Sequence, residues 1–343
     1  MTAARRTSEA LRTIAVATYD TVAAATAASI PAEIRIVWLN GYDAAGDAPV
    51  ARYVRTGSEP AHAGGKFQSA DGQWWAISGP DLYVEQFGLM GDGVTDDLAS
   101  LLEAEECRAA LSAVLHFGPK NYYLSNPNAV AMTRPRWRGS EANATLITCD
   151  GASSACFFFE GTGGYTAGFI ENITFWAPAS RTTGWCLYFD GDATYQADEF
   201  RGRNVKITGT GSWAIPLYMS GKDRTSPQGL RLVSWTDLFI GRDTSIGIYA
   251  DNCVQLEIAG GGIYGGTTND LTVTSTHGSL SSADSMITRF KVNGDVVFDK
   301  VTSGIFQGIC GTITLTANCS NVHASGVCAT VTNSGTSNVV QFA

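Results

Sequence analysis

From about residue 145 to the end of the chain, short stretches of alternating apolar and polar residues recur between turns rich in glycine and asparagine. A period of two is the pattern of a β-strand that buries one face. The clearest stretches are residues 170–176, 202–209, 229–235, 251–260, 269–275, 288–294, 311–317 and 328–333. If one inward position recurs on each of them, it falls on Ile173, Val205, Leu232, Leu256, Val273, Val292, Ile313 and Val331, with steps of 17 to 32 residues.

Two all-β folds compete for this repeat: the stacked coils of a parallel β-helix and a β-sandwich built from hairpins. A sandwich favours Asn-Gly or Asp-Gly turns at shorter spacing, and Asn293-Gly294 has few companions here. In a solenoid each coil buries its apolar side chains against the next one. We therefore predict an all-β chain in which residues 81–343 form a parallel β-helix.

Two further segments precede the predicted solenoid. Residues 1–30 are alanine-rich with few large apolar side chains, which predicts a helix that is stable mainly when packed on a partner. Residues 31–80 predict a small antiparallel β module, because 33–39 and 51–57 alternate and 65–78 reads as a hairpin around Asp71-Gly72.

Residues 87–102, FGLMGDGVTDDLASLL, lie at the boundary of these regions. The stretch supplies glycines for a tight turn, a helix N-cap candidate, two first-turn acids and leucines at helical spacing. These residues are Gly88, Gly91, Gly93, Thr95, Asp96, Asp97, Leu98, Leu101 and Leu102. They predict a helix over residues 95–111 that caps the solenoid's open N-terminal end. The plain alternative is an ordinary capped helix. A calcium loop is disfavoured because its third ligand position falls on Val94.

The glycine-aspartate-glycine and threonine-aspartate-aspartate order in this stretch resembles the signature that opens the pectate-lyase-like right-handed β-helix of bacteriophage tailspikes and related virion depolymerases. Residues 31–79 more weakly resemble the module that precedes many such β-helices, through Gly41-Tyr42, Gly46-Asp47 and the strand around Trp74-Trp75. The resemblance implies a homotrimeric phage or prophage spike. Its amino-terminal region would attach to other virion proteins, and its β-helix would meet host surface polysaccharide. The predicted β-helix is short for that family, and no separate carboxy-terminal trimer domain is recognised.

Charge and cysteine usage narrow the possible partners. The 343 residues carry a formal charge of −9, which disfavours nucleic acid. An acidic polysaccharide would also be repelled overall, so it would need a local basic patch. The eight cysteines include no CxxC pair, which disfavours a metal site and favours reduced, buried thiols. No cofactor motif, signal peptide or membrane span is recognised, which predicts no cofactor and folding in a cytosolic compartment. The resemblance to tailspikes implies that this compartment is the host cytoplasm and that the protein acts as part of a virion.

Cleavage of a glycosidic bond usually needs two carboxylates roughly 5 Å apart for retention or 6.5–9.5 Å apart for inversion. Alternation along residues 251–260 predicts that Glu257 faces outward on the solenoid. Its candidate partners are Asp237 and Asp190, reaching in from turns or from a neighbouring subunit. By the same alternation Lys206 and Arg231 face outward, where each could bind a glycan or stabilise charge in an elimination reaction. Solvated turn aspartates are the plain alternative for the acids.

Aromatic residues gather between residues 176 and 249, close to turns, and flat rings offer a sugar an apolar face with a polar edge. The predicted substrate-binding rings are Trp185, Tyr188, Trp213 and Trp235, and Trp176, Tyr218 and Tyr249 belong to the same cluster. The alternative is that such rings stack inside the solenoid. Three functions stay open: a polysaccharide-cleaving spike, a spike that only binds or builds the particle, and, disfavoured by the lack of a secretion signal, a cellular pectate-lyase-like enzyme.

Overall fold

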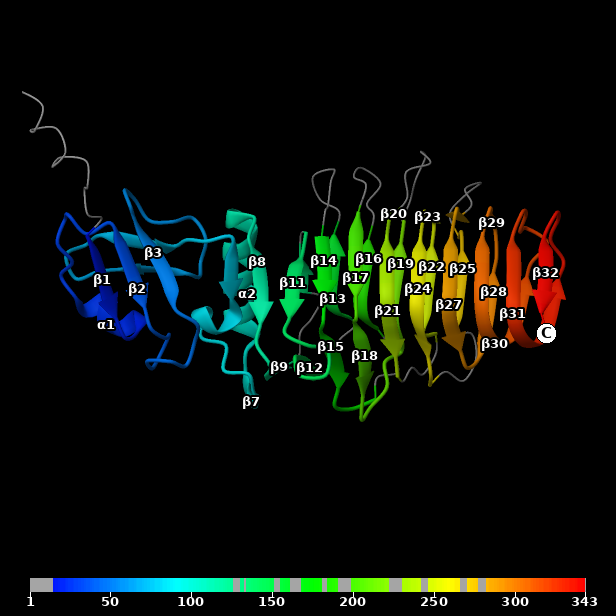
Figure 1. Cartoon of the computed structure of the whole chain (residues 1–343), viewed down its shortest axis with the longest axis horizontal. Helices are drawn as coiled ribbons and strands as arrows, with labels where there is room; N and C mark the ends of the chain where they lie inside the picture. The colour runs from blue at the N-terminus through cyan, green and yellow to red at the C-terminus, as the bar shows by residue number, and fades with distance from the viewer. Residues whose placement is uncertain are drawn as a thin grey trace, which may run out of the picture. The chain divides into compact units, whose positions relative to one another are not determined.

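The computed structural model describes residues 15–125, 130–132, 134–150, 155–160, 168–180, 184–190, 199–221, 230–241, 246–265, 270–276 and 282–342. The chain divides into two compact units. The first comprises Met1–Leu89 and Ala99–Leu115, and the second comprises Met90–Leu98 and His116–Ala343. The first unit is built around a small sheet, and the second is a solenoid whose strands lie side by side from β11 to β32 (Figure 1).

A five-stranded sheet in the order β1-β2-β3-β5-β4 organises the first unit. Its strands are β1 (Val16–Tyr19), β2 (Ile36–Leu39), β3 (Ala51–Thr56), β4 (Lys66–Gln68) and β5 (Trp74–Ile77). The β1–β2 pair is parallel and the other three pairs are antiparallel. The antiparallel module and its hairpin are thus present where the sequence predicted them. Gly72, at a φ of 83°, takes the turn position that favours glycine.

The helix expected over residues 1–30 is wrong for part of its length. Val16–Tyr19 form strand β1, and α1 is confined to Val22–Ala27. Thr21 caps α1, because its hydroxyl oxygen accepts a hydrogen bond from the Ala24 amide at 3.0 Å. The alternating residues of β1 gain a partner strand in β2, which an isolated short helix lacks. Residues 1–14 of the expected helix lie outside the described residues.

Trp75 forms the centre of the first unit's core. Its side chain is fully buried, and its indole nitrogen donates a hydrogen bond to the Ser69 hydroxyl at 3.1 Å. Phe67 stacks on it at 6.1 Å between ring centroids, and the Arg55 guanidinium lies 4.8 Å from its ring. Burial raises the pKa of the neighbouring Tyr53 hydroxyl well above its ordinary value. The Gly-Gln-Trp-Trp strand therefore serves the fold of this unit.

Four short elements join the sheet of the first unit to the solenoid: β6 (Asp81–Tyr83), the 3-10 helix η1 (Val84–Phe87), α2 (Leu98–Leu111) and β8 (Val114–Phe117). Helix α2 carries a buried ion pair, because the Arg108 side chain donates to both oxygens of Glu105 at 2.9 and 2.8 Å. The helix expected over residues 95–111 is present but begins at Leu98. Its role as a cap of the solenoid stays a prediction.

The Gly-Asp-Gly stretch forms strand β7 (Asp92–Asp96) where a helix start was expected, and its acids organise the turn. Asp92 accepts hydrogen bonds from the amides of Val94 and Thr95 and from the Thr95 hydroxyl. Thr95 therefore does not cap the helix. Asp96 instead accepts from the Leu98 amide at 3.1 Å. Asp97 is buried and accepts from the amides of Met90 and Gly91.

The solenoid is a right-handed parallel β-helix with three sheet faces, and its described strands pair in parallel from coil to coil. The first face comprises β11 (Arg136–Gly139), β14 (Gly168–Glu171), β17 (Phe200–Arg203) and the first halves of β21 (Ser234–Ile240), β24 (Glu257–Ile263), β27 (Met286–Val292), β30 (Ile305–Leu315) and β31 (His323–Asn333), with β32 (Val339–Phe342). The second face comprises β9 (Asn121–Ser125), β12 (Leu146–Asp150), β15 (Thr174–Ala177), β18 (Lys206–Gly209) and the second halves of β21, β24 and β27.

The third face carries the long run of separate strands that concerns the function. It comprises β10 (Val130–Met132), β13 (Ala155–Glu160), β16 (Trp185–Asp190), β19 (Ile215–Ser220), β22 (Ile248–Asp251), β25 (Leu271–Thr274), β28 (Asp295–Phe298) and the second halves of β30 and β31. A small fourth sheet comprises β20 (Leu230–Arg231), β23 (Cys253–Val254), β26 (Ser282–Ala283) and β29 (Val301–Thr302).

The coils shorten along the solenoid. One inward position of the first face is taken in turn by Trp137, Ile170, Gly202, Trp235, Ile258, Ile287, Phe306, Ala324 and Val340. The first three steps of this series take 32 or 33 residues, and the last three take 16 to 19. The early strands β11, β14 and β17 have 4 residues each, whereas β30 and β31 have 11, so the early coils are not longer because their strands are longer.

The apolar interior is continuous from coil to coil. Trp235 is fully buried and packs against Phe189 and Phe200, with ring centroids 5.8 and 5.3 Å away. Gly202, at the equivalent place on the preceding coil, makes this possible, because a Cβ atom there would lie 2.0 Å from the Trp235 ring. A large side chain on one coil is thus accommodated by the absence of one on the coil before it.

Two ladders of left-handed residues form the corners of the coils. One runs through Asn172, Asn204, Asp237, Gly260 and Arg289, all with φ between 50° and 78°. The other runs through Leu232, Gln255, Asp284, Ser303, Asn321 and Ser337, with φ between 53° and 61°. Each corner interrupts the alternation of inward and outward side chains. The inward place expected for Leu232 is therefore wrong, and its side chain is 43 % exposed.

Candidate functional site

A column of aromatic side chains runs along the outside of the third face, over three successive coils. Tyr188, Tyr218 and Tyr249 are in register on β16, β19 and β22. The rings of Tyr218 and Tyr249 stack in parallel, 5.1 Å apart and tilted by 2°. Trp185 lies over the first two tyrosines, with its centroid 4.8 Å from Tyr188 and 5.3 Å from Tyr218. We call these four residues the aromatic column.

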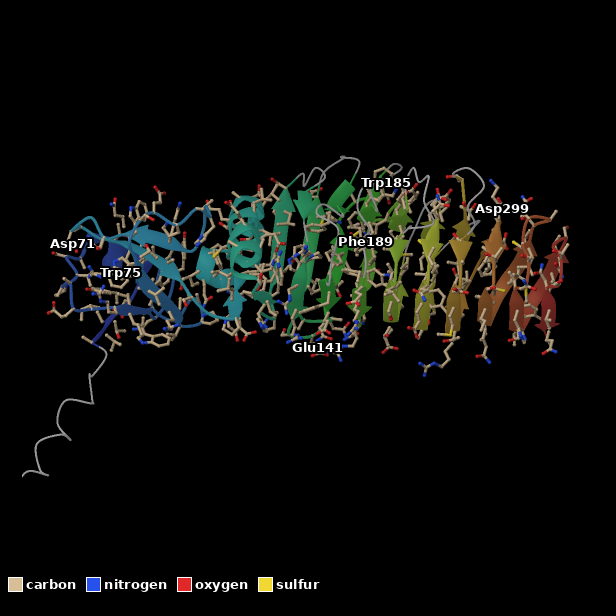
Figure 2. The ribbon with its side chains drawn as sticks, turned by 90° about the horizontal axis from the view of Figure 1, so that it is seen from above. Asp71, Trp75, Glu141, Trp185, Phe189 and Asp299 are labelled. Carbon is tan, nitrogen blue, oxygen red and sulfur yellow. The ribbon has the colours of Figure 1, made fainter. Side chains whose placement is uncertain are left out.

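Trp185 has a further feature that bears on binding. Its indole nitrogen is buried and finds no hydrogen-bond partner in the part of the chain that the structure describes. Its side chain as a whole is only half-buried. Because this nitrogen is buried, the part of Trp185 that is open to a ligand is the exposed portion of its ring. Figure 2 shows Trp185 near the edge of the solenoid, whereas Phe189 of the same strand lies inside it.

Acid and hydroxyl side chains follow the aromatic column two residues further along each strand. The residues in register there are Glu160, Asp190, Ser220, Asp251 and Thr274. Asp251 is buried, and its carboxylate accepts hydrogen bonds from the amide and the hydroxyl of Thr276. The side chains of Glu160 and Asp190 lie outside the described residues. We call this set the acid–hydroxyl column.

The acid–hydroxyl column affects the ionisation of a tyrosine in the aromatic column. Burial, followed by the Asp251 carboxylate and the Tyr218 ring, raises the pKa of the Tyr249 hydroxyl to about 12. The phenol therefore stays neutral and can donate a hydrogen bond at any physiological pH. Further along the same face, burial acts to raise the pKa of Asp299, but hydrogen bonds from Thr316 and Asn318 outweigh it and lower the pKa. Asp299 thus stays a carboxylate, at the solenoid edge that also carries Trp185 (Figure 2).

Glu257, predicted as the general acid or base, lies on the first face. It is in register with Ser234 and Met286, and the Ser234 hydroxyl lies 3.4 Å from its carboxylate. Asp190 lies on the third face, so a single chain does not bring Glu257 and Asp190 onto one surface. A joint role of these two acids would therefore need a neighbouring subunit.

Asp237, the other predicted partner, is a corner residue of the first ladder, with a φ of 54°. Aspartate and asparagine are the non-glycine residues that tolerate this conformation best, which accounts for its presence there. Its Oδ1 atom lies beside Gly260, three residues beyond Glu257 on the neighbouring coil. The backbones of Asp237 and Glu257 are therefore on the order of 10 Å apart along the strand direction.

Two of the four rings that were predicted to bind sugar lie inside the solenoid. Trp213 and Trp235 have no exposed surface, so neither can stack on a ligand. Trp235 fills the space above Gly202, and Trp213 donates a hydrogen bond to the Thr208 carbonyl oxygen at 3.3 Å. Trp185 and Tyr188 both belong to the aromatic column, although only 9 % of Tyr188 is exposed.

The predicted cationic residues are not on the third face either. Lys206 lies on the second face, where its ammonium group is hydrogen-bonded to Asn143 and lies 5.8 Å from the Phe239 ring. Arg231 lies in strand β20 of the small fourth sheet, and its side chain is outside the described residues.

A repeat of four residues in the sequence marks the third face. The segments Leu187–Asp190, Leu217–Ser220 and Ile248–Asp251 each read aliphatic, tyrosine, any residue, then aspartate or serine. They recur after 30 and 31 residues and occupy equivalent places in the coils. This repeat places Asp251 beside Tyr218 and Tyr249, and Asp251 was not among the predicted acids.

Comparison with known proteins supports the fold. No family profile and no curated protein sequence matches the chain. Among solved structures, it resembles the tailspike protein gp49 of the Acinetobacter baumannii bacteriophage Fri1, described as a capsular polysaccharide depolymerase, with a TM-score of 0.54 at 11 % identity. This match covers 95 % of the chain and 69 % of gp49. The tailspike of Acinetobacter phage vB_ApiP_P1 gives a TM-score of 0.49 at 12 % identity, covering 95 % of the chain and 70 % of that protein.

The chain therefore has the parallel β-helix fold found in phage tailspikes, as its sequence predicted. In the described part of the chain, no three His, Cys, Asp or Glu side chains gather as they would around a metal ion. None of the described helices is both long and apolar enough to cross a membrane.

Proposed function

We propose that this protein is a phage virion spike that recognises host surface polysaccharide through the third face of its β-helix. The aromatic column carries this proposal, because it presents stacked rings over coils that also carry acids and hydroxyls. Rings of this kind bind the apolar faces of sugars, and the adjoining polar groups fix the ligand's orientation. The likeness to a tailspike depolymerase in fold agrees with such a role.

We further propose that, if the spike cleaves its glycan, the reacting acids belong to the acid–hydroxyl column. Glu160 and Asp190 are in register on adjacent coils, and Asp251 follows Asp190 after two coils. Adjacent coils lie ~4.8 Å apart, so these steps span the separations used for retention and for inversion. Glu257 and Asp237 remain the rival pair, on the first face and its corner.

A spike that only binds is the second candidate. Its support is the state of Asp251, the one acid of this column whose side chain is described: it is buried and engaged by Thr276. A carboxylate held in this way stabilises a strand end and is poorly placed to exchange protons with a substrate.

Purified protein should be incubated with host capsule and with lipopolysaccharide, and assayed for binding, for new reducing ends and for ultraviolet-absorbing unsaturated products. Asp190→Asn is expected to lower turnover by ~10²–10⁴-fold while binding persists, as for the loss of a general acid or base. Glu257→Gln is the matched control and should retain activity. If Asp190→Asn retains full activity and Glu257→Gln loses it, the catalytic site lies on the first face. Binding without any product would establish the binding spike.

We also propose a homotrimer whose subunits meet along the last coils. Exposed apolar side chains gather there, at Met286, Ile305, Ile309, Val327 and Val339, each 39 to 52 % exposed. Met286 and Ile305 are in register on adjacent coils, and so are Ile309 and Val327. His323 lies between Ile305 and Val339 in this register, so the apolar side chains form two pairs and a single valine on adjacent coils. Exposed apolar side chains that gather in this way mark a protein interface. Residues 1–30 would then attach the trimer to other virion proteins.

Light scattering should give three times the 36.3 kDa subunit mass. Ile305→Asp combined with Val339→Asp is expected to yield the subunit mass. Val94→Asp, at a side chain 79 % exposed outside that surface, should leave the trimer intact. A wild-type protein that scatters as a monomer at micromolar concentration would refute the trimer.

A further inference from the structure

Four arginines surround one phenylalanine and one glutamate on the outside of the first face. Along β11, β14 and β17 the register runs Arg136, Phe169, Arg201 in one column and Arg138, Glu171, Arg203 in the next. The two outer strands are two coils, or ~9.6 Å, apart. We call these six residues the arginine cluster.

The contacts inside the cluster hold its guanidinium groups in place. The Glu171 Oε2 atom accepts hydrogen bonds from Arg138 at 2.9 Å and from Arg203 at 3.4 Å. The Glu171 side chain is only 16 % exposed, whereas those of Arg138 and Arg203 are 43 % and 60 % exposed. Arg136 and Arg138 also lie over the Phe169 ring, at 5.9 and 5.3 Å. One half-buried carboxylate and one ring thus orient cations that remain accessible to solvent.

The six residues of the arginine cluster have an excess of positive charge among themselves. They carry four positive charges and one negative charge, in a chain whose formal charge is −9. The flanking Arg134 and Glu199 add one charge of each sign. The next coil continues the two columns with the neutral Ser234 and Thr236. Arg201 is exposed and forms no ion pair within the described residues.

We propose that the arginine cluster binds the carboxylate groups of an acidic polysaccharide, at a site distinct from the aromatic column. This rests on the proposed function as a polysaccharide-binding spike and adds the class of glycan. The planar guanidinium group fits a carboxylate with two parallel hydrogen bonds. A polyanion that the overall negative charge repels gains a local region of opposite sign here. The apolar residues of the proposed subunit contact begin at Met286, three coils beyond Arg201.

The test uses the full-length protein and two defined probes, polygalacturonate and the neutral glucan dextran. Affinity is measured by calorimetry or fluorescence at rising salt concentrations. Wild-type protein is expected to bind polygalacturonate and to lose affinity as salt rises, because exposed charges are screened. Arg201→Gln with Arg203→Gln should bind it at least tenfold more weakly. Arg203→Lys keeps the positive charge but loses the paired guanidinium donors, so its affinity should lie between those of the wild type and the double variant.

Arg289→Gln is the matched control. Arg289 is an exposed arginine on a later coil and should not affect binding. Circular dichroism and the thermal midpoint verify that each variant is folded. Unchanged affinity of the Arg201/Arg203 variant, equal binding of dextran, or tighter binding of a DNA duplex than of polygalacturonate would each overturn the inference. Should Tyr218→Ala abolish binding of host capsule while the arginine variants bind it normally, the proposed function stands and this inference alone fails.

Discussion

The early and late coils of the solenoid both bury an apolar interior, but the early coils use more residues for each turn. The first three steps along the first face take 32 or 33 residues, and the last three take 16 to 19. The interior is apolar in both regions, from Trp137 and Ile170 to Phe306 and Ala324. What differs is the outside: the long coils carry the aromatic column and the arginine cluster, whereas the short coils expose Ile305, Ile309 and Val327. The interior therefore sets stability, and the outward residues of the long coils supply the candidate binding surfaces.

The largest expected effect tests whether both regions depend on their interior to the same degree. Trp235→Ala should lower the free energy of unfolding by ~3–5 kcal/mol, because Gly202 has no side chain to fill the space left behind. Phe306→Ala in a short coil should fall at the lower end of that range. Denaturant unfolding monitored by circular dichroism measures both. A larger loss for Phe306→Ala would contradict the dependence on Gly202.

Binding should separate the two regions most clearly. Tyr218 and Thr314 occupy equivalent outward places on the third face, on a long and a short coil. Tyr218→Ala is expected to weaken glycan binding about tenfold, since an aromatic contact contributes ~0.5–1.5 kcal/mol beyond its area. Thr314→Ala should leave affinity unchanged. Titration of the host glycan against each variant measures this. Equal losses would show that ligand contact extends along the whole face.

The second ladder of left-handed residues allows the residue types of a long and a short coil to be exchanged. Leu232 in a long coil and Asn321 in a short one occupy left-handed positions of the same ladder, at φ of 53° and 55°. Leu232→Asn should raise the free energy of unfolding by ~1 kcal/mol, because asparagine tolerates this conformation better than leucine. Asn321→Leu should lower it by a similar amount. If both substitutions shift the denaturation midpoint in one direction, the corner conformation is not what decides stability there.

The smallest effects concern two acids with opposite pKa shifts. Burial raises the pKa of Asp270, whose Oδ1 atom has no partner in the described structure, so its charge costs stability once pH exceeds the unfolded-state pKa. Hydrogen bonds lower the pKa of Asp299, so its carboxylate stabilises the fold above the unfolded-state pKa and less as pH falls through the folded-state pKa. At pH 7 Asp270→Asn should raise the thermal midpoint and Asp299→Asn should lower it. Both differences should shrink near pH 3, and persistence there would exclude ionisation as their cause.

Local patterns in the sequence predicted the fold well. The hairpin at Gly72 and many of the solenoid strands follow from period-two alternation and turn residues, whereas β16, β19, β28 and β32 were not among the predicted stretches. Alternation fails at the corners, where a left-handed residue resets which side chains point inward. Leu232 is therefore exposed at its corner. Val254, one residue before the corner at Gln255, is half-buried, although the alternation along residues 251–260 that places Glu257 outside would place it inside.

The candidate site was predicted less well because side chains are brought together by register between coils. Trp235 lies inside the solenoid because the residue 33 positions earlier is glycine, and no local sequence pattern predicts that pairing. Asp237 has an acidic side chain but a corner conformation that accounts for it. Only the repeated tyrosine-containing segments at residues 187–190, 217–220 and 248–251 would have identified the third face from sequence.

The pairing of Gly202 with Trp235 has a consequence for how this chain can diverge. A Cβ atom at residue 202 would lie 2.0 Å from the indole ring, so alanine cannot appear there while tryptophan remains at 235. A smaller residue at 235 would in turn leave a void until residue 202 grew. The two sites are thus expected to change together in descendants, as large–small or small–large exchanges. The residue that one coil of the β-helix can carry is then constrained by the coil stacked against it.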